Sequence, residues 1–288
     1  MATPMEKRDS KLKGRYPIPT DKCTEAEFLT GVEKHQLTIL RDDGVCRHLI
    51  FKRPDHSNYW FELVTWNNKL CISGDMGTWV FSRLPDMFDF FRTEQKDRPS
   101  PQLRINLSYW AEKCVSADRD GIKRFSPELF RSVMWEYTVD NAPSRAAMRE
   151  VEEDVLSRAD DGEHEAINAA VNFESEDGWT LRHAWETDCT DYTYGFTWIC
   201  YAIAWGIKQY DASLNTEKEI KFEDIRPGDV ISTSHIEGWP ESVTIIQAAR
   251  PSQFASFFAQ TSEPYGLALS GFHGSTVMRL KREVKNDG

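Results

Sequence analysis

Short runs in which apolar and polar residues alternate occupy the first third of the chain. Alternation with a period of two directs one side of an extended segment to a core and the other side to solvent. Turn-forming residues at 42–44 and 54–58 separate the first three runs, and Gly74 and Gly77 flank a sharp turn or bulge between the last two. The pattern predicts an antiparallel sheet of four or five strands, at 36–40, 47–51, 60–66, 70–72 and 78–81.

After Pro85 the apolar residues recur every three or four positions, which is the spacing of one helix face. Ser126-Pro127-Glu128 is typical of a helix start, because it supplies a capping hydroxyl, a proline for the first turn and an acid near the positive end of the dipole. Ser144 can cap the next helix, which Asp160-Asp161-Gly162 interrupts. An aromatic helix is expected at 191–210, at the centre of a helical layer, because its middle is apolar on all sides.

Beyond Asp211, β-prone runs return between glycines and prolines, and strands are predicted at 229–231, 243–246 and 276–280. The expected fold class is therefore α+β: an N-terminal antiparallel sheet, a helical middle and a small mixed or β-rich C-terminal lobe. The expected organisation has three parts, which are a mobile leader at 1–24, a main domain at 25–211 and a smaller lobe at 212–288.

The chain has 288 residues and a net charge of −11, from 46 acidic and 35 basic side chains. Direct binding to nucleic acid is not expected, because such binding is driven by Lys and Arg that displace counterions from phosphates. The longest uncharged run, 192–207, is shorter than the roughly 20 residues that span a bilayer, and the N-terminal residues lack the apolar segment of a secretion signal. We expect a cytoplasmic protein without membrane contact.

Six scattered cysteines without a C-x-x-C pair are expected to be reduced thiols. Cys189 before a predicted helix, Pro227-Gly228-Asp229 and then His235 are together similar to NlpC-type cell-wall peptidases. That resemblance implies a Cys-His hydrolase, in which a histidine on a following strand lies within hydrogen-bond reach of the thiol and activates it. The other interpretation is a turn and a structural thiol, and Thr190-Asp191 departs from the small residues of that family.

No metal or cofactor site is predicted. The acidic cluster from Asp160 to Glu165 is consecutive in sequence, so its side chains point to different faces of a helix rather than toward one ion. A calcium loop that began at Asp118 would need a glutamate where Leu129 stands. The glycine-rich stretch 73–77 lacks the lysine and the spacing of a phosphate-binding loop, so it is interpreted as a turn.

Aromatic residues between 192 and 210 recur at helical spacing, which is mostly typical of packing in a core. Those at the edge of such a stripe can instead anchor a partner protein, because aromatic rings bury much area at low entropic cost. Other aromatic residues stand in the irregular C-terminal region. The candidate interface residues are Tyr192, Tyr194, Trp239, Phe254, Phe257 and Phe258.

Several strings between residues 36 and 211 together resemble a family of accessory proteins of bacteriophages and prophages. They are 72–81 (ISGDMGTWVF), 86–91 (DMFDFF), 151–157 (VEEDVLS), 160–163 (DDGE), 192–194 (YTY) and 202–207 (AIAWGI). The resemblance implies a phage origin and a place in the host bacterial cytoplasm. The size and the mixed fold are also similar to those of the Gabija anti-defence proteins, which bind a nuclease and ATPase assembly and prevent it from cutting phage DNA.

The resemblance implies a non-enzymatic inhibitor that needs no cofactor and binds a host defence complex, with the Gabija nuclease/ATPase as the candidate target. Such an inhibitor would block DNA binding or cleavage sterically. A multi-subunit target requires an interface above the standard size of about 1,600 Å², so a homo-oligomer or an extended contact is expected. The alternatives are the Cys-His hydrolase and a structural or regulatory phage protein.

Overall fold

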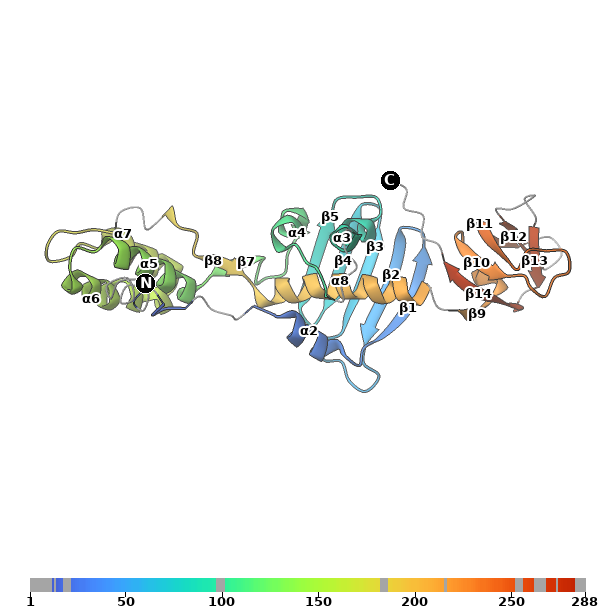
Figure 1. Cartoon of the computed structure of the whole chain (residues 1–288), viewed down its shortest axis with the longest axis horizontal. Helices are drawn as coiled ribbons and strands as arrows, with labels where there is room; N and C mark the ends of the chain where they lie inside the picture. Colours follow the sequence, from blue (N-terminus) through green and yellow to red (C-terminus); the bar gives the residue numbers. More distant parts are fainter. Residues whose placement is uncertain are drawn as a thin grey trace, which may run out of the picture. The chain divides into compact units, whose positions relative to one another are not determined.

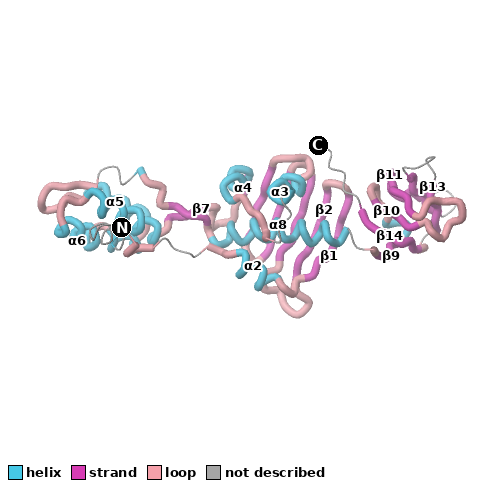
Figure 2. The backbone as a smooth tube through the Cα atoms, viewed as in Figure 1, coloured by secondary structure: helices cyan, strands magenta, loops and turns pink. Residues whose placement is uncertain are grey.

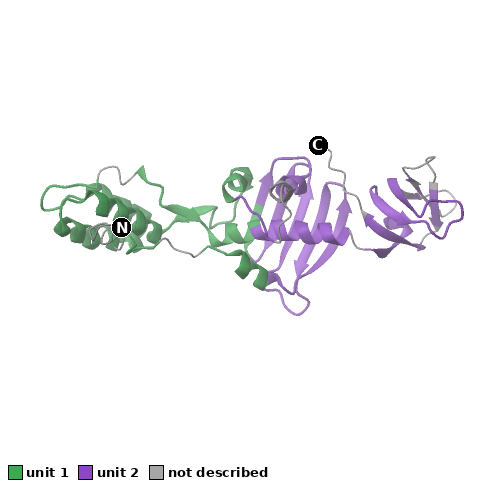
Figure 3. Cartoon of the chain, in the orientation of Figure 1, with its two compact units in different colours: residues 1–31, 76–79, 107–200 green, residues 32–75, 80–106, 201–288 purple. Residues whose placement is uncertain are grey.

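The computed structural model describes residues 12, 14–17, 22–96, 102–181, 186–214, 217–251, 256–261, 268–272 and 274–282. It confirms the α+β class, with an N-terminal antiparallel sheet, a helical middle and a small C-terminal sheet (Figures 1 and 2). The chain forms two compact units (Figure 3): unit 1 comprises 1–31, 76–79 and 107–200, and unit 2 comprises 32–75, 80–106 and 201–288. The three-part division expected from the sequence stays a prediction.

The N-terminal sheet contains all five predicted strands and one more, in the order β1-β2-β3-β4-β5-β6. Their bounds are β1 Gln36–Asp43, β2 Cys46–Lys52, β3 Phe61–Trp66, β4 Lys69–Gly74, β5 Gly77–Ser82 and β6 Cys114–Ser116. Alternate residues are buried, as the pattern predicted: Leu49 and Phe51 on β2 lie opposite Leu63 and Phe61 on β3. The three-residue β6 was not predicted, because so short a strand carries no period.

The glycine-rich string between β4 and β5 is a structural turn. A Cβ atom on Gly74 would collide with the backbone of Trp60 and Phe61, and Gly77 has a φ of +83° that favours glycine. A Cβ atom on Gly77 would also collide with the carboxyl group of Asp118. These close approaches account for both glycines without a phosphate ligand.

The helical elements include the helix expected after Pro85 and the two expected after Ser126 and Ser144. The described helices are α2 Glu25–Val32, α3 Met87–Lys96, α4 Leu107–Lys113, α5 Pro127–Asn141, α6 Arg145–Asp154, α7 Glu163–Asn172 and α8 Tyr194–Leu214, with the 3-10 turns η1 Leu156–Asp161 and η3 Phe222–Asp224. The Ser126 hydroxyl accepts from the Leu129 N–H at 3.1 Å, and the Ser144 hydroxyl accepts from the Ala147 N–H at 3.1 Å. Both predicted N-caps are therefore confirmed.

Helices α5, α6 and α7 pack around a core of their own within unit 1, which includes Phe130, Trp135, Val151 and Phe173. Leu12 and Tyr16, from the segment expected to be a mobile leader, also pack against this core. The described residues around 12–16 are thus held by the helices.

Helix α8 differs from its prediction at both ends. It begins at Tyr194 rather than at 191, because Thr190–Tyr192 forms a strand, β8. The Thr193 hydroxyl accepts from the Phe196 N–H at 3.2 Å and donates to the Gly121 carbonyl at 2.9 Å, which fixes the helix start. The helix then continues past the expected end at 210 to Leu214.

The expected place of α8 at the centre of a helical layer is wrong, since its second half lies on the sheet (Figure 1). Gly206 brings the helix so close that a Cβ atom there would lie 3.0 Å from Leu63 and 3.1 Å from Phe51. Strands cover its apolar sides together with two helices. Trp205 contacts Phe51 and Phe61 of the sheet, Trp198 packs on Phe28 of α2, and Tyr210 packs on Phe88 of α3. Within the described residues, none of the helices combines the length and the apolar character needed to cross a bilayer.

The C-terminal sheet contains the three predicted strands and three more, in the order β13-β12-β11-β10-β14-β9. Their bounds are β9 Lys218–Lys221, β10 Asp229–Ser232, β11 Ser242–Pro251, β12 Ser256–Thr261, β13 Ala268–Phe272 and β14 Thr276–Arg282. Phe222, Ile231 and Val243 belong to a separate buried cluster. Asp229 is fully buried and accepts from the Arg226 N–H at 2.8 Å, so the Pro-Gly-Asp string is a structural turn.

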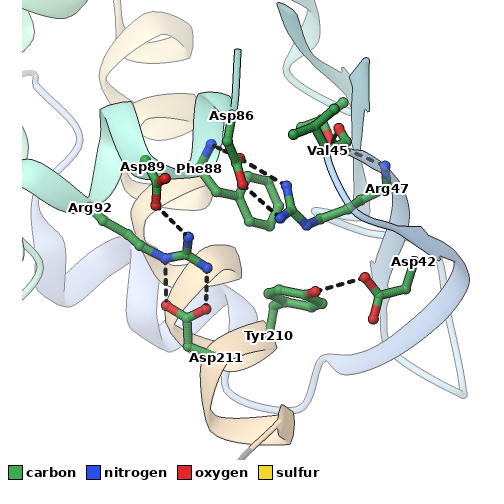
Figure 4. Close-up of polar contacts among 10 residues, drawn as sticks. Asp42, Val45, Arg47, Asp86, Phe88, Asp89, Arg92, Tyr210 and Asp211 are labelled. Carbon is green, nitrogen blue, oxygen red and sulfur yellow. Dashed lines mark hydrogen bonds and ion pairs between the residues drawn. The ribbon is translucent and has the colours of Figure 1, made fainter. Parts of the chain in front are cut away.

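A polar network ties the first hairpin of the sheet to α3 and to the end of α8 (Figure 4). Arg47 on β2 donates two hydrogen bonds to Asp86, at 2.9 and 2.7 Å, and its guanidinium lies 4.6 Å from the ring centre of Phe88. On the other side the Tyr210 hydroxyl donates to Asp42 at 2.8 Å. Burial alone would lower the pKa of Arg47, but the hydrogen bonds and the charge of Asp86 raise it above the ordinary value.

Arg92 on α3 forms the second half of this network (Figure 4). It donates to Asp211 on α8 at 2.9 and 2.5 Å and to Asp89 at 2.9 Å. Arg47 and Arg92 thus contact carboxylates from different elements, and Phe88 lies within cation–π range of both. The network holds elements together, and each of its charged side chains has a hydrogen-bond partner within it, so we assign it a structural role.

Candidate functional site

Two short strands of unit 1 form a ribbon that carries one of the predicted interface residues, Tyr192, and ends shortly before another, Tyr194. Strand β7 (Lys123–Phe125) pairs antiparallel with β8 (Thr190–Tyr192), and Lys123 lies opposite Tyr192. Backbone hydrogen bonds continue at both ends, from the Ser126 N–H to Cys189 at 2.9 Å and from the Thr193 N–H to Ile122 at 3.0 Å. This continuous pairing fixes the backbone of residues 189–193.

A cleft of about 350 Å³ opens between the ribbon and the start of α5. One wall is the helix start at 126–128, the floor is the segment 191–194, and Lys22, Arg124 and Phe125 complete the lining. The cleft therefore contains both Tyr192 and Tyr194. It brings together residues that lie far apart in the sequence but belong to one compact unit.

Each tyrosine is held differently in this cleft. The Tyr192 ring stacks on Phe196, with centroids 5.7 Å apart, and the ammonium group of Lys123 lies 5.1 Å from its centre. Tyr194 is 39% exposed at the first position of α8. A partly exposed ring on a fixed backbone loses little conformational freedom on binding, which suits an interface anchor.

Charged groups of both signs surround the two rings. Lys22 forms an ion pair with Asp191 at 2.9 Å, and the Ser126 hydroxyl donates to Glu128 at 3.2 Å. Arg124 is exposed at the edge of the cleft. An aromatic centre with a polar rim is the usual composition of a protein–protein interface.

Asp188 lies just before the ribbon, at the end where Thr190 pairs with Phe125. The hydroxyl and the backbone N–H of Thr190 donate to its carboxylate at 2.5 and 2.9 Å, and these hydrogen bonds lower the pKa of Asp188. Lys123 adds an ion pair to the same carboxylate at 3.4 Å. The charge on Asp188 therefore persists at neutral pH and below it.

The two residues of the hydrolase alternative lie in surroundings different from those expected. Cys189 precedes strand β8 rather than a helix, and His235 lies exposed in a turn after β10 rather than on a strand. Cys189 belongs to unit 1 and His235 to unit 2. These are corrections to the expected placement, and the hydrolase activity itself stays a prediction.

The chemical environment of Cys189 opposes thiolate formation. Burial raises the pKa of this thiol to about 11, and the negative charges of Asp188 and Glu163 act in the same direction. A nucleophilic cysteine needs the opposite, a pKa lowered by a neighbouring positive charge or a helix N-terminus. All six cysteines are free thiols, as expected.

The C-terminal interface candidates are either partly buried or lie outside the described part. Trp239 is partly buried and packs against the core of the C-terminal sheet, so much of its ring has a structural role. Phe257 and Phe258 lie on β12, which pairs with β11 and β13, but their side chains are outside the described part. Phe254 lies outside the described residues altogether.

The sequence pattern did not reveal the partners of the two tyrosines in the cleft. Lys22, Arg124 and Ser126 come from segments that are distant in sequence from residue 192, and three-residue strands give no periodic signal. In the part of the chain that the structure describes, no three His, Cys, Asp or Glu side chains are grouped as metal ligands would be.

Comparison of the chain with protein-family models, with curated proteins and with solved structures found no match. The contacts described above, together with the resemblance of the sequence strings, are therefore the basis for a functional assignment.

Proposed function

We propose that this chain is a phage-encoded, non-enzymatic inhibitor that binds a bacterial anti-phage defence complex, with the Gabija nuclease/ATPase assembly as the candidate target. The observation that carries the proposal is the cleft in which Tyr192 and Tyr194 lie on a fixed backbone within a rim of charged residues. The string resemblance to phage accessory proteins supports the choice of a defence complex.

The cleft supplies affinity through its aromatic centre. Rigid tyrosines bury a large area and cost little side-chain entropy, and residues of this kind dominate the binding energy of many interfaces. The ion pair between Lys22 and Asp191 is partly solvated, with side chains 45% and 20% exposed, so it contributes more to orientation than to affinity.

The net charge of −11 supports a target surface that normally binds DNA. A nuclease must attract phosphates with Lys and Arg side chains, and such a basic surface also attracts an acidic protein over a distance. An inhibitor bound there prevents DNA from binding by occupying the same surface. Association should then slow as the salt concentration rises.

A plaque count tests the proposal directly. Bacteria that carry one defence system each, Gabija included, are infected with and without expression of the chain. We expect plaques to be rescued in the Gabija strain, and the target to co-purify with the chain. Absence of rescue in every strain, with the protein shown to be soluble, would remove the inhibitor function.

Substitutions separate the cleft from the rest of the surface. Tyr194→Ala combined with Tyr192→Ala should abolish rescue and co-purification, because the aromatic centre is lost. Trp66→Ala is the matched control, since Trp66 is 39% exposed like Tyr194 but lies at the end of β3. Melting curves check that the variants remain folded. If the tyrosine variant still rescues plaques, the cleft is not the interface.

The two alternatives make different predictions in the same assay. A hydrolase predicts that Cys189→Ala loses the effect while its fold stays intact, whereas the inhibitor predicts full rescue by that variant. A structural or regulatory phage protein predicts no effect on any defence system. Light scattering of the purified chain tests the expected homo-oligomer.

A further inference from the structure

A second cavity of unit 1, of about 650 Å³, lies between α5, α6 and the segment around residue 15. Its lining residues are Leu12, Arg15, Trp135, Arg145, Met148, Arg149 and Glu152. Four of them stand on α6 at intervals of three, one and three residues, so one face of that helix forms a wall. The volume is within the range of small-molecule sites.

One of the three arginines at this cavity is already paired. Arg15 forms an ion pair with Glu152 at 3.1 Å, and its guanidinium lies 5.5 Å from the ring centre of Trp135. The Tyr16 hydroxyl also donates to Glu152, at 3.0 Å. The single carboxylate of the lining is therefore engaged by Arg15 and Tyr16.

The other two arginines lack an acidic partner. In the described part of the chain no carboxylate lies within ion-pair distance of Arg145 or Arg149, and the polar contact of Arg149 is a 3.4 Å hydrogen bond to the Arg145 carbonyl. The two are four residues apart on one helix face, where like charges repel. Two exposed positive charges thus remain at a cavity of a protein whose net charge is −11.

The charges of α6 also run against its dipole. Arg145 and Arg149 stand in its first half, where the helix dipole favours acids, and the acids Glu152, Glu153 and Asp154 stand in its last turn. This order does not stabilise the helix through its dipole. A bound anion would relieve the repulsion and would also interact favourably with the start of the helix.

We propose that this cavity binds a mononucleotide. Its phosphate group lies against Arg145 and Arg149, whose guanidinium groups donate paired hydrogen bonds to phosphate oxygens. The apolar side chains of Leu12 and Met148 contact the base. Trp135 is buried, with Arg15 over its ring, and forms the rigid wall behind them. Beside a phosphate group the cavity has room for a second, weakly polar part of a ligand. The site is distinct from the cleft at the ribbon and does not rest on the proposed function.

Isothermal titration of the full chain with AMP, adenosine and inorganic phosphate tests the proposal. We expect AMP to bind more tightly than either of its parts, and binding to weaken as salt is added. The variant R145Q/R149Q should weaken AMP binding at least tenfold. The matched control R158Q, which changes an arginine on η1 outside the cavity lining, should bind AMP like the original chain.

Melting curves keep this test independent of folding. R145Q/R149Q should melt at the same or a higher temperature than the original chain, and AMP should raise the melting temperature of the original chain but not of the variant. Absence of AMP binding at millimolar concentration would overturn the proposal. Equal AMP binding by R145Q/R149Q would also overturn it, as would adenosine or phosphate that binds as tightly as AMP.

Discussion

The buried pair of Arg47 and Asp86 allows a sharp test of how charge holds unit 2 together. Asp86→Asn keeps the shape of the side chain and its role as acceptor for the Phe88 N–H, now at 2.9 Å, because asparagine caps helices as well as aspartate does. It removes only the negative charge. Arg47, 5% exposed, is then left with a neutral partner.

The expected cost follows from these contacts. Two hydrogen bonds to a carboxylate become at most one hydrogen bond to a neutral amide oxygen, and a buried guanidinium loses its compensating charge. The ring of Phe88 at 4.6 Å still offsets part of that loss. We expect Asp86→Asn to lower the free energy of unfolding by about 2–4 kcal/mol, below the full cost of breaking a buried pair.

The double variant Arg47→Met with Asp86→Asn is the matched control. Methionine fills most of the volume of the arginine stem against Phe88 and leaves no buried charge, so stability should return to within about 1 kcal/mol of the original chain. Urea unfolding followed by circular dichroism gives the free energies, and hydrogen exchange of peptides from β2 and α3 locates the change. If both variants lose the same stability, or if Asp86→Asn costs below about 0.5 kcal/mol, the reasoning is refuted.

Three other predictions concern single features of the fold. Gly77→Ala should lower the free energy of unfolding by at least about 2 kcal/mol in urea, because the φ of +83° is strained for alanine and its Cβ atom would collide with the carboxyl group of Asp118. The control Gly44→Ala has a φ of +61° but open space around the Cβ atom, and should lower it by about 1 kcal/mol. Burial raises the pKa of Tyr210 from 10.0 to about 12, so its unionised hydroxyl stabilises the fold below pH 10, and this contribution is lost as the pH rises to 12. Relative to Tyr210→Phe, the original chain should lose about 2–3 kcal/mol of unfolding free energy over that range in urea unfolding. The same dependence of stability on pH in both proteins would contradict this. Without ligand, R145Q/R149Q should be more stable by about 0.5 kcal/mol in the same measurement, and a loss of stability would show that the two arginines hold the fold.

The features that the sequence predicted well depend on neighbours in the chain. The caps at Ser126 and Ser144 need only the backbone three residues ahead, and both are present. The first five strands follow from alternation and turn residues, which act over a few positions. Gly162, with a φ of +118°, separates η1 from α7 where the string Asp-Asp-Gly indicated an interruption.

The features that the sequence missed depend on distant partners. The ribbon pairs residues 123–125 with 190–192, and neither strand is long enough to show a period. Because residues 190–192 belong to the ribbon, α8 begins at Tyr194 rather than at the predicted residue 191. The apolar character of α8 was predicted, but it could not tell a covering sheet from covering helices, because both surfaces are equally apolar. The sequence predicted Tyr192 and Tyr194 as anchors, and both line one cleft, but it did not indicate the charged residues around them.

Arginines that have an acidic partner and arginines that lack one occupy different places in this chain. In unit 2, Arg47 and Arg92 each contact carboxylates from other elements, and these contacts stabilise the packing. In unit 1, Arg145 and Arg149 have no such partner among the residues that the structure describes, although the chain carries 46 acidic residues. A charge that stabilised α6 would stand at the opposite end of the helix. Departures from local stability are expected where a protein binds something, so these two positions, rather than the paired arginines, are where a ligand should be sought first.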